Sequence, residues 1–304
     1  MLCLPPTSRS TMQVMFQGIL SGYLSFGFPL EVKQLALTVV QSTIDVYSAI
    51  SKEMLPTPQK SHYTFNLRDV SKVIQGILMI QNNRCTSVPT MVRLWAHECM
   101  RVFHDRLINT EDKSWFSELL VNLLKKNFQL NWTTEELFGS TTLENDSGNE
   151  ARKKSVRSKV HPPLMFVDFL RGIADDNTGE GQEDADQENA VETRPYEEID
   201  HYEQVTRVLE NALEDYNLVH PTTMNLVFFR DALEHVARIT RILRQKRGNA
   251  MLVGVGGSGK QSLSRLSGYI CGMQCVQIEI TKGYGGSEFR EDIKLMMIQA
   301  GVGG

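Results

Sequence analysis

The chain has 304 residues, of which 41% are hydrophobic and 22% charged, and its formal net charge is −4 at pH 7. This length allows two domains that each bury a core, and an acidic chain without a basic, aromatic-rich face is not expected to bind nucleic acid. The sequence contains no run of about 18 apolar residues, which is the length needed to cross a membrane. Pro5 and Pro6 interrupt the N-terminus before the apolar segment of a signal peptide forms. We therefore expect an intracellular protein with no nucleic-acid partner and no membrane partner.

The five cysteines are scattered and odd in number, which favours reduced thiols. Cys271 and Cys275 are close in sequence, but no second pair completes a zinc site. His97 and His104 lie on one predicted helix without a third ligand nearby, so we expect packing or surface roles for them rather than metal binding.

Residues 8–130 predict a run of helices without a strand of comparable length, and we assign residues 1–140 to one all-helical unit. Ser10 is the expected N-cap of a helix over Thr11–Leu24. The next apolar residues recur at helical spacing over Leu30–Met54, and Pro56 ends this pattern.

Three further helices are expected in this unit. Asn66 is a good N-cap, with Asp69 placed to favour the helix dipole, and the residues after it form an apolar stripe. Pro89 suits the first position of a helix that reaches Leu107, and Thr110 can cap the last helix, which reaches Leu124.

Residues 141–195 lose this periodicity and are predicted to be a charged, partly disordered linker. A basic run around Arg152 can in principle bind an acidic partner, although a solvated linker is the simpler interpretation. The apolar piece Leu164–Leu170 is expected to dock on one domain. Asp175–Glu192 holds eight acidic residues and no Lys or Arg, which predicts a mobile loop.

The third part of the chain, residues 196–304, begins with two predicted helices, over Tyr196–Tyr216 and Asn225–Arg244. The second helix collects basic residues near its C-terminal end, where the helix dipole is a sufficient reason for them. These residues are Arg238, Arg241, Arg244, Lys246 and Arg247. A predicted strand over Ala250–Val253 follows.

The stretch Gly254-Val-Gly-Gly-Ser-Gly-Lys260 has the pattern of a nucleotide phosphate loop between this strand and a helix over Gln261–Met273. Glycines allow a tight turn whose N–H groups converge, the helix adds the positive end of its dipole, and the lysine reaches the outer phosphates. We predict ATP or ADP as the ligand; the alternative is a glycine-rich turn that binds nothing. The candidate binding residues are Gly254, Gly256, Gly257, Ser258, Gly259, Lys260, Gln261 and Ser262.

The loop departs from the usual pattern at one position. A hydroxyl residue is expected directly after the lysine to hold Mg²⁺, but Gln261 stands there and Ser262 follows it. An amide oxygen can ligate Mg²⁺ more weakly, so Gln261 is the candidate metal ligand. Phosphate binding is therefore better supported than catalysis.

A second strand is predicted over Cys275–Ile280, and a helix capped by Ser287 is predicted to reach Ala300. Only 44 residues follow Lys260, which is too few to complete a parallel sheet, because each β-α-β unit takes about 30 residues. No later apolar strand ends in an acidic pair, and Glu279 within the second strand is expected to be structural. We predict half of a nucleotide site and no catalytic residue, which leaves open whether the chain is an enzyme.

Several motifs together resemble axonemal dynein heavy chains, which are ring-shaped AAA+ motors with several ATPase modules in one polypeptide. The stretch Gly248–Leu266, including its unusual Lys-Gln-Ser, resembles the start of the fourth module, as do Met224–Ala232 and Lys282–Gly285. Residues 61–110 resemble the helical lid of the third module, through the motifs Tyr63–Ser71 and Leu94–Cys99.

The resemblance implies a mixed fold, in which an all-α AAA+ lid at residues 1–140 and a linker at 141–195 precede an incomplete α/β P-loop core at 196–304. It implies that Arg68 is a sensor-2 residue reaching the phosphate of a nucleotide held by its own module, and that Asn225–Phe229 walls the adenine of the next site.

The implied function is that of a segment of a microtubule motor, which contributes a Walker A loop for ATP and Mg²⁺ to the AAA+ ring for ciliary movement. The parent motor hydrolyses ATP, whereas this segment lacks a Walker B strand. The implied partners are the other AAA+ modules and, through the parent, microtubules and dynein intermediate and light chains. The implied locations are the cytoplasm, the cytoskeleton and the ciliary axoneme.

Two alternatives remain from the residues alone. One is a truncated helical interaction module that binds partners and no nucleotide. The other is a separate phosphate-loop kinase or hydrolase, which the missing acidic strand disfavours.

Overall fold

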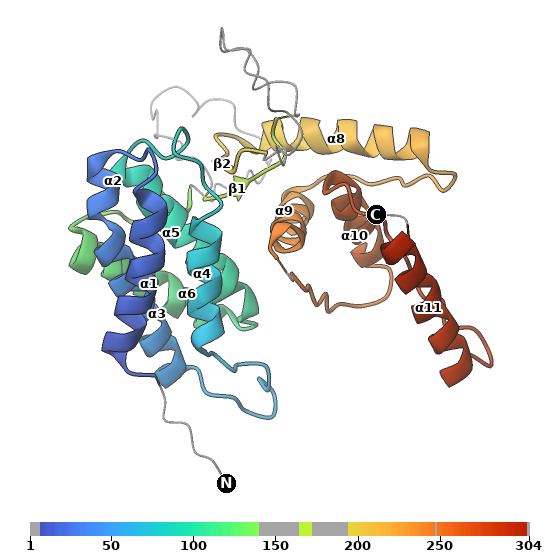
Figure 1. The fold of residues 1–304 in the computed structure, drawn as a ribbon, viewed down its shortest axis with the longest axis horizontal. Helices are drawn as coiled ribbons and strands as arrows, with labels where there is room; N and C mark the ends of the chain where they lie inside the picture. Colours follow the sequence, from blue (N-terminus) through green and yellow to red (C-terminus); the bar gives the residue numbers. More distant parts are fainter. Residues whose placement is uncertain (1–6, 140–163, 172–193, 247, 303–304) are drawn as a thin grey trace, which may run out of the picture.

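A computed structural model describes residues 7–139, 164–171, 194–246 and 248–302 (Figure 1). The basic run around Arg152 and the acidic stretch Asp175–Glu192 lie outside these described residues. Figure 1 shows a helical bundle formed by the first part of the chain and a second group of helices beside it, with two short strands between them. Within the described residues, no helix is both long and apolar enough to span a bilayer.

The bundle, which we call the helical unit, consists of helices and two short helical turns. They are α1 (Arg9–Leu24), α2 (Leu30–Gln34), α3 (Ala36–Glu53), α4 (Leu67–Ile77), α5 (Val88–Val102), the 3₁₀ turn η1 (His104–Arg106), α6 (Thr110–Leu123), the π turn η2 (Leu124–Phe128) and α7 (Thr134–Phe138).

The starts of these helices show where local signals decide the structure. At α4, the side chain of Asn66 accepts the N–H of Arg68 at 2.9 Å, while Asp69 accepts the N–H of Asn66 at 2.9 Å, so the predicted cap forms a reciprocal capping box. At α1, by contrast, the cap is Ser8 rather than Ser10. Ser8 and Ser10 are both suitable N-caps, and it is the Ser8 side chain that accepts the Thr11 N–H.

The prediction of one helix over Leu30–Met54 is wrong, because the chain breaks at Leu35 into α2 and α3. The Leu35 N–H bonds to the Val32 carbonyl three residues earlier, which tightens the turn and redirects the axis. The break lets Val32 and Val39 both enter the core, where neither is exposed.

The core of the helical unit is centred on Trp95 of α5, which is fully buried. Its indole N–H donates to the Thr43 hydroxyl of α3 at 3.0 Å, and that hydroxyl in turn donates to the Val39 carbonyl at 2.7 Å. The buried indole is thereby satisfied, and α3 and α5 are joined by a polar contact inside an apolar core.

Two short strands connect the helical unit to the rest. β1 (Phe166–Val167) pairs antiparallel with β2 (Glu197–Glu198). The apolar piece around β1 is buried, but it does not dock on one unit alone. Phe166 packs into the core of the helical unit, whereas Met165 and Val167 pack into the second core. Successive residues of a strand point to opposite faces, which explains this division.

The second group, which we call the loop unit, contains α8 (Tyr202–Val219), α9 (Arg230–Arg244), α10 (Lys260–Ile270) and α11 (Gly286–Val302). The prediction that its first helix begins at Tyr196 is wrong, because residues 197–198 pair with β1 instead. The prediction that the next helix begins at Asn225 is also wrong, because residues 225–229 are not helical and α9 begins at Arg230.

The two predicted strands, Ala250–Val253 and Cys275–Ile280, are not formed in the described residues. Apolar side chains on them face solvent instead: Met251 is 90% exposed and Ile280 is 84% exposed. A strand needs a hydrogen-bonded neighbour, and no described segment pairs with either one. The expected α/β core is therefore present as its helices without a parallel sheet.

Thr43→Val tests the polar contact in the core. Valine keeps the shape of threonine but leaves the buried Trp95 N–H without an acceptor, so we expect the free energy of unfolding to fall by about 1–3 kcal/mol. The measurement is urea unfolding followed by tryptophan fluorescence.

The matched control is Ser48→Ala on the same helix, since Ser48 also donates to the carbonyl four residues back, at 2.7 Å, but serves no buried partner. We expect this control to cost less than about 1 kcal/mol. Equal losses for the two variants would show that the Trp95 contact does not matter.

Candidate functional site

The glycine-rich stretch of the loop unit turns sharply just before α10. Gly257 and Gly259 both have φ of +78°, a conformation that side chains with a Cβ rarely adopt. The first hydrogen bond within α10 runs from the Leu263 N–H to the Gly259 carbonyl at 2.9 Å. The amides of residues 260–262 therefore have no acceptor inside the helix and are available at its N-terminus.

Lys260 lies inside this turn. Its ammonium donates to the carbonyls of Gly254 at 2.7 Å and Val255 at 2.6 Å and to the Ser258 hydroxyl at 3.0 Å. Residues 254–258 are exposed, whereas Lys260 is half-buried. The loop thus wraps around one positive charge at the positive end of a helix, which is an arrangement suited to an anion.

The two residues after Lys260 lie in the first turn of α10. Gln261 is exposed and Ser262 is half-buried. The described residues contain no cluster of three or more His, Cys, Asp or Glu side chains of the kind that holds a metal ion by itself. The site therefore fits phosphate well, and it offers Mg²⁺ at most an amide oxygen and a hydroxyl beside the phosphates.

The helix that carries the loop is firmly packed. Leu263, Leu266 and Ile270 of α10 are buried in the second core together with residues of α8 and α9. Arg194 caps the other end of α10 by donating to the Ile270 carbonyl at 2.7 Å. The position of the loop is consequently set by the contact of α10 with α9.

Arg68 is not brought to this loop. It lies in the first turn of α4 in the helical unit, where its side chain is exposed. The described contacts of Arg68 consist of the bond from its backbone N–H to Asn66.

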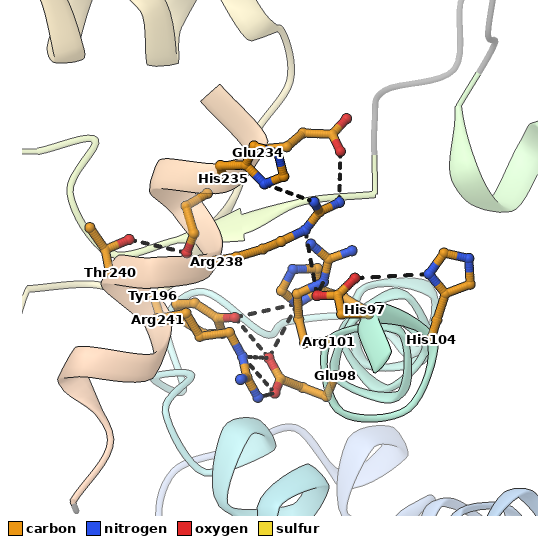
Figure 2. Close-up of polar contacts among 12 residues, drawn as sticks. His97, Glu98, Arg101, His104, Tyr196, Glu234, His235, Arg238, Thr240 and Arg241 are labelled. Carbon is orange, nitrogen blue, oxygen red and sulfur yellow. Dashed lines mark hydrogen bonds and ion pairs between the residues drawn. The ribbon is translucent and has the colours of Figure 1, made fainter. Parts of the chain in front are cut away.

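A second group of charged residues lies between the two units (Figure 2). Arg241 of α9 forms an ion pair with Glu98 of α5, and the two side chains are 5% and 0% exposed. The Arg241 Nε lies 3.1 Å from Glu98 Oε2, and the Tyr196 hydroxyl donates to Glu98 Oε1 at 2.7 Å. His97 Nδ1 lies 3.2 Å from the same Oε1.

Two further ion pairs extend this group along α9. Arg238 Nε lies 3.4 Å from a carboxylate oxygen of Asp105, and Arg244 Nε lies 2.9 Å from one of Asp168. The arginines are three residues apart and therefore share one face of α9. The helix dipole alone therefore does not account for these basic residues, because each of the three has a carboxylate partner. The sequence carries a signal of this charged interface. The three arginines recur every third residue, and Glu98 and Asp105 are seven residues apart.

Burial governs how the central group titrates. Burial lowers the pKa of His97 to about 4, although the neighbouring Glu98 carboxylate acts in the opposite direction. Burial raises the pKa of Glu98, but Arg241 and His97 more than offset this, so that the pKa is about 2. At neutral pH the cluster therefore holds one buried carboxylate, one buried guanidinium and a neutral imidazole.

These shifts predict that acid destabilises the chain. Because the pKa of His97 is lowered from 6.5 to about 4 on folding, the unfolded chain binds the proton more tightly, and stability is lost as the pH falls from 6.5 toward 4. The loss from His97 is about 3 kcal/mol by pH 4. Folding lowers the pKa of Glu98 from 4.5 to about 2, so its protonation removes further stability as the pH falls from 4.5 toward 2.

The measurement is the urea midpoint at several pH values between 7 and 4 for wild type and His97→Gln, and we expect a shallower pH dependence in the variant. The exposed His201 provides the control. His201→Gln should keep the wild-type dependence of the urea midpoint on pH. The expectation fails if His97→Gln also keeps the wild-type dependence.

Comparisons with known proteins agree with both parts of the chain. Residues 16–113 match the family model described as "Dynein heavy chain, ATPase lid domain", and residues 224–304 match "P-loop containing dynein motor region D4". The resemblance to axonemal dynein heavy chains predicted from the motifs is thereby confirmed.

Individual relatives match nearly the whole chain. It is 42% identical over 302 residues to "Dynein axonemal heavy chain 6" of Homo sapiens, a match that covers 99% of this chain and 6% of that protein. It is 41% identical over 273 residues to "Dynein-1-beta heavy chain, flagellar inner arm I1 complex" of Chlamydomonas reinhardtii, covering 90% of this chain and 5% of the relative. The chain thus spans only a small part of the length of these relatives, and it belongs to the dynein heavy-chain family.

Proposed function

We propose that this segment contributes a phosphate-binding loop for ATP or ADP to the AAA+ ring of a dynein motor. The observation that supports this proposal is the turn of residues 254–260, in which Lys260 lies at the N-terminus of α10 among exposed backbone amides. Gly254, Gly256 and the residues through Ser262 form the proposed binding set.

The chemistry of the loop favours a polyphosphate. The three donors of the Lys260 ammonium bond to neutral oxygens of its own loop. Hydrogen bonds to charged oxygens are roughly twice as strong as those between neutral groups, so a phosphate would compete well for these donors. The positive φ at Gly257 and Gly259 lets consecutive N–H groups approach the same anion.

We propose that Mg²⁺ accompanies the nucleotide. Mg²⁺ usually retains several waters and takes its other ligands from substrate phosphates, so one or two weak protein ligands are enough. Gln261 directly follows Lys260 and is the proposed ligand, with Ser262 beside it. When bound, the ion would neutralise phosphate charge. The contacts of Lys260 with its own loop support binding, and binding is the role that we propose for this segment.

We propose an organisation in three parts, and the family matches at residues 16–113 and 224–304 lie within the first and the third of them. Residues 1–140 form the lid of the third module, 141–195 form a linker, and 196–304 begin the core of the fourth. We propose that Arg68 reaches the nucleotide of its own module, as sensor-2 residues do. Through the parent motor, the proposed partners are the other AAA+ modules, microtubules, and dynein intermediate and light chains, and the proposed location is the ciliary axoneme.

An alternative function has one observation in its favour. The segments on either side of α10 expose apolar side chains, including Val253 at 85% and Val255 at 80%. Such surfaces suit protein contacts. In this alternative the chain is a helical interaction module that binds no nucleotide.

Lys260→Ala distinguishes the two functions. We expect the full chain to bind a fluorescent ATP analogue saturably and the variant to lose at least tenfold in affinity, because a charge-assisted contact to the phosphates is removed. The control, Lys294→Ala, removes an equal charge from an exposed ion pair on α11 and should leave the affinity unchanged. A folded wild-type chain that does not bind would favour the interaction module.

Gln261→Ala tests the proposed metal ligand. We expect nucleotide affinity without Mg²⁺ to stay near the wild-type value, while the gain in affinity on adding Mg²⁺ shrinks severalfold, because an amide oxygen is lost and the backbone amides remain. Titrations with and without Mg²⁺ measure this gain. An undiminished gain would remove Gln261 from the metal site.

A further inference from the structure

The contact between Arg241 and Glu98 joins two separately packed cores. Glu98 belongs to α5 of the helical unit, and Arg241 belongs to α9 of the loop unit, 143 residues away in sequence. The buried apolar residues form two clusters, one in each unit. In Figure 2 the Arg241 side chain extends from α9 to the Glu98 carboxylate beside α5.

The helical unit has a recess that fits this guanidinium. Gly76 lies within α4, where a glycine weakens the helix relative to alanine. A Cβ at this position would overlap with the Glu98 carboxylate and would lie 2.8 Å from Arg241 Nη2. Glu98 cannot easily move aside, because Tyr196 and His97 also contact it. The missing side chain of Gly76 therefore makes room for the Glu98 carboxylate and for the Arg241 guanidinium that is paired with it.

The charges on the two sides of the contact are complementary. The loop unit supplies Arg238 and Arg241, and the helical unit supplies Asp105 and Glu98. Removing one member of a buried ion pair strands the other charge without water, whereas replacing both with apolar residues of similar size is often tolerated. Such a contact is therefore stable only when a charge on one unit meets the opposite charge on the other unit.

We propose that Arg241 and its recess, formed by Gly76, Glu98 and Tyr196, are the latch that docks the loop unit onto the helical unit. The latch requires matched charges, and its release frees α9 together with α10. The proposal does not rest on nucleotide binding, since it concerns the contact between the units alone.

Hydrogen exchange of the full chain, read by mass spectrometry for each helix, tests the latch. Arg241→Gln strands the Glu98 carboxylate, so we expect exchange in α9 to rise by roughly a hundredfold or more. Exchange in α1 and α3, which lie in the core of the helical unit, should stay at the wild-type rate. The double variant Glu98→Met with Arg241→Met should restore protection of α9.

Gly76→Ala provides an independent test that leaves every charge in place. Its methyl group should raise exchange in α9 as Arg241→Gln does. The matched control is Gly18→Ala in α1, where a Cβ would meet no atom within 4 Å. We expect no increase in α9 exchange for this control.

Two results would overturn the proposal. If Arg241→Gln left exchange in α9 unchanged, the ion pair would not hold the units together. If it raised exchange equally in α1, α3 and α9, Arg241 would be part of one cooperative core, with no separate docking step.

Discussion

The structure depends on keeping one carboxylate and one guanidinium together where water does not reach them. Glu98 and Arg241 are both buried, and taking either charge out of water alone would cost several kcal/mol. The surrounding residues reduce this cost in different ways: Tyr196 donates a hydrogen bond to Glu98, and Gly76 provides space against α4. Four segments distant in sequence thus meet around one charge pair, which fixes the helical unit and the loop unit relative to each other.

The phosphate loop is connected to this pair through two helices. Lys260 begins α10, which packs against α9, and α9 carries Arg241. The loop itself is exposed at residues 254–258. The shape of the loop is determined locally, by Gly257, Gly259 and the ammonium of Lys260. Its location in the molecule is determined by the packing of α10 against other helices. This separation explains why a short motif can be recognised from sequence while its surroundings cannot.

Features determined by neighbouring residues were predictable from the sequence. The cap at Asn66 and the apolar stripe that follows it formed as expected, and the glycine turn precedes a helix as its pattern indicates. Some errors are local, such as the cap of α1 and the break at Leu35, but the larger ones concern contacts between distant residues. Cys275–Ile280 has the composition of a strand, but a strand forms only beside another one. Arg241 has a local reason to end a helix, so nothing in its neighbourhood revealed a partner 143 residues away.

The short strand β1 has a consequence for the spacing of the chain. Phe166 enters one core and Val167 enters the other, so adjacent residues serve different units. A slip of one residue in the pairing of β1 with β2 would exchange these faces and place a ring where the second core accommodates a smaller branched side chain. The number of residues through this strand is therefore constrained, and an insertion or deletion within residues 165–169 should disrupt both cores.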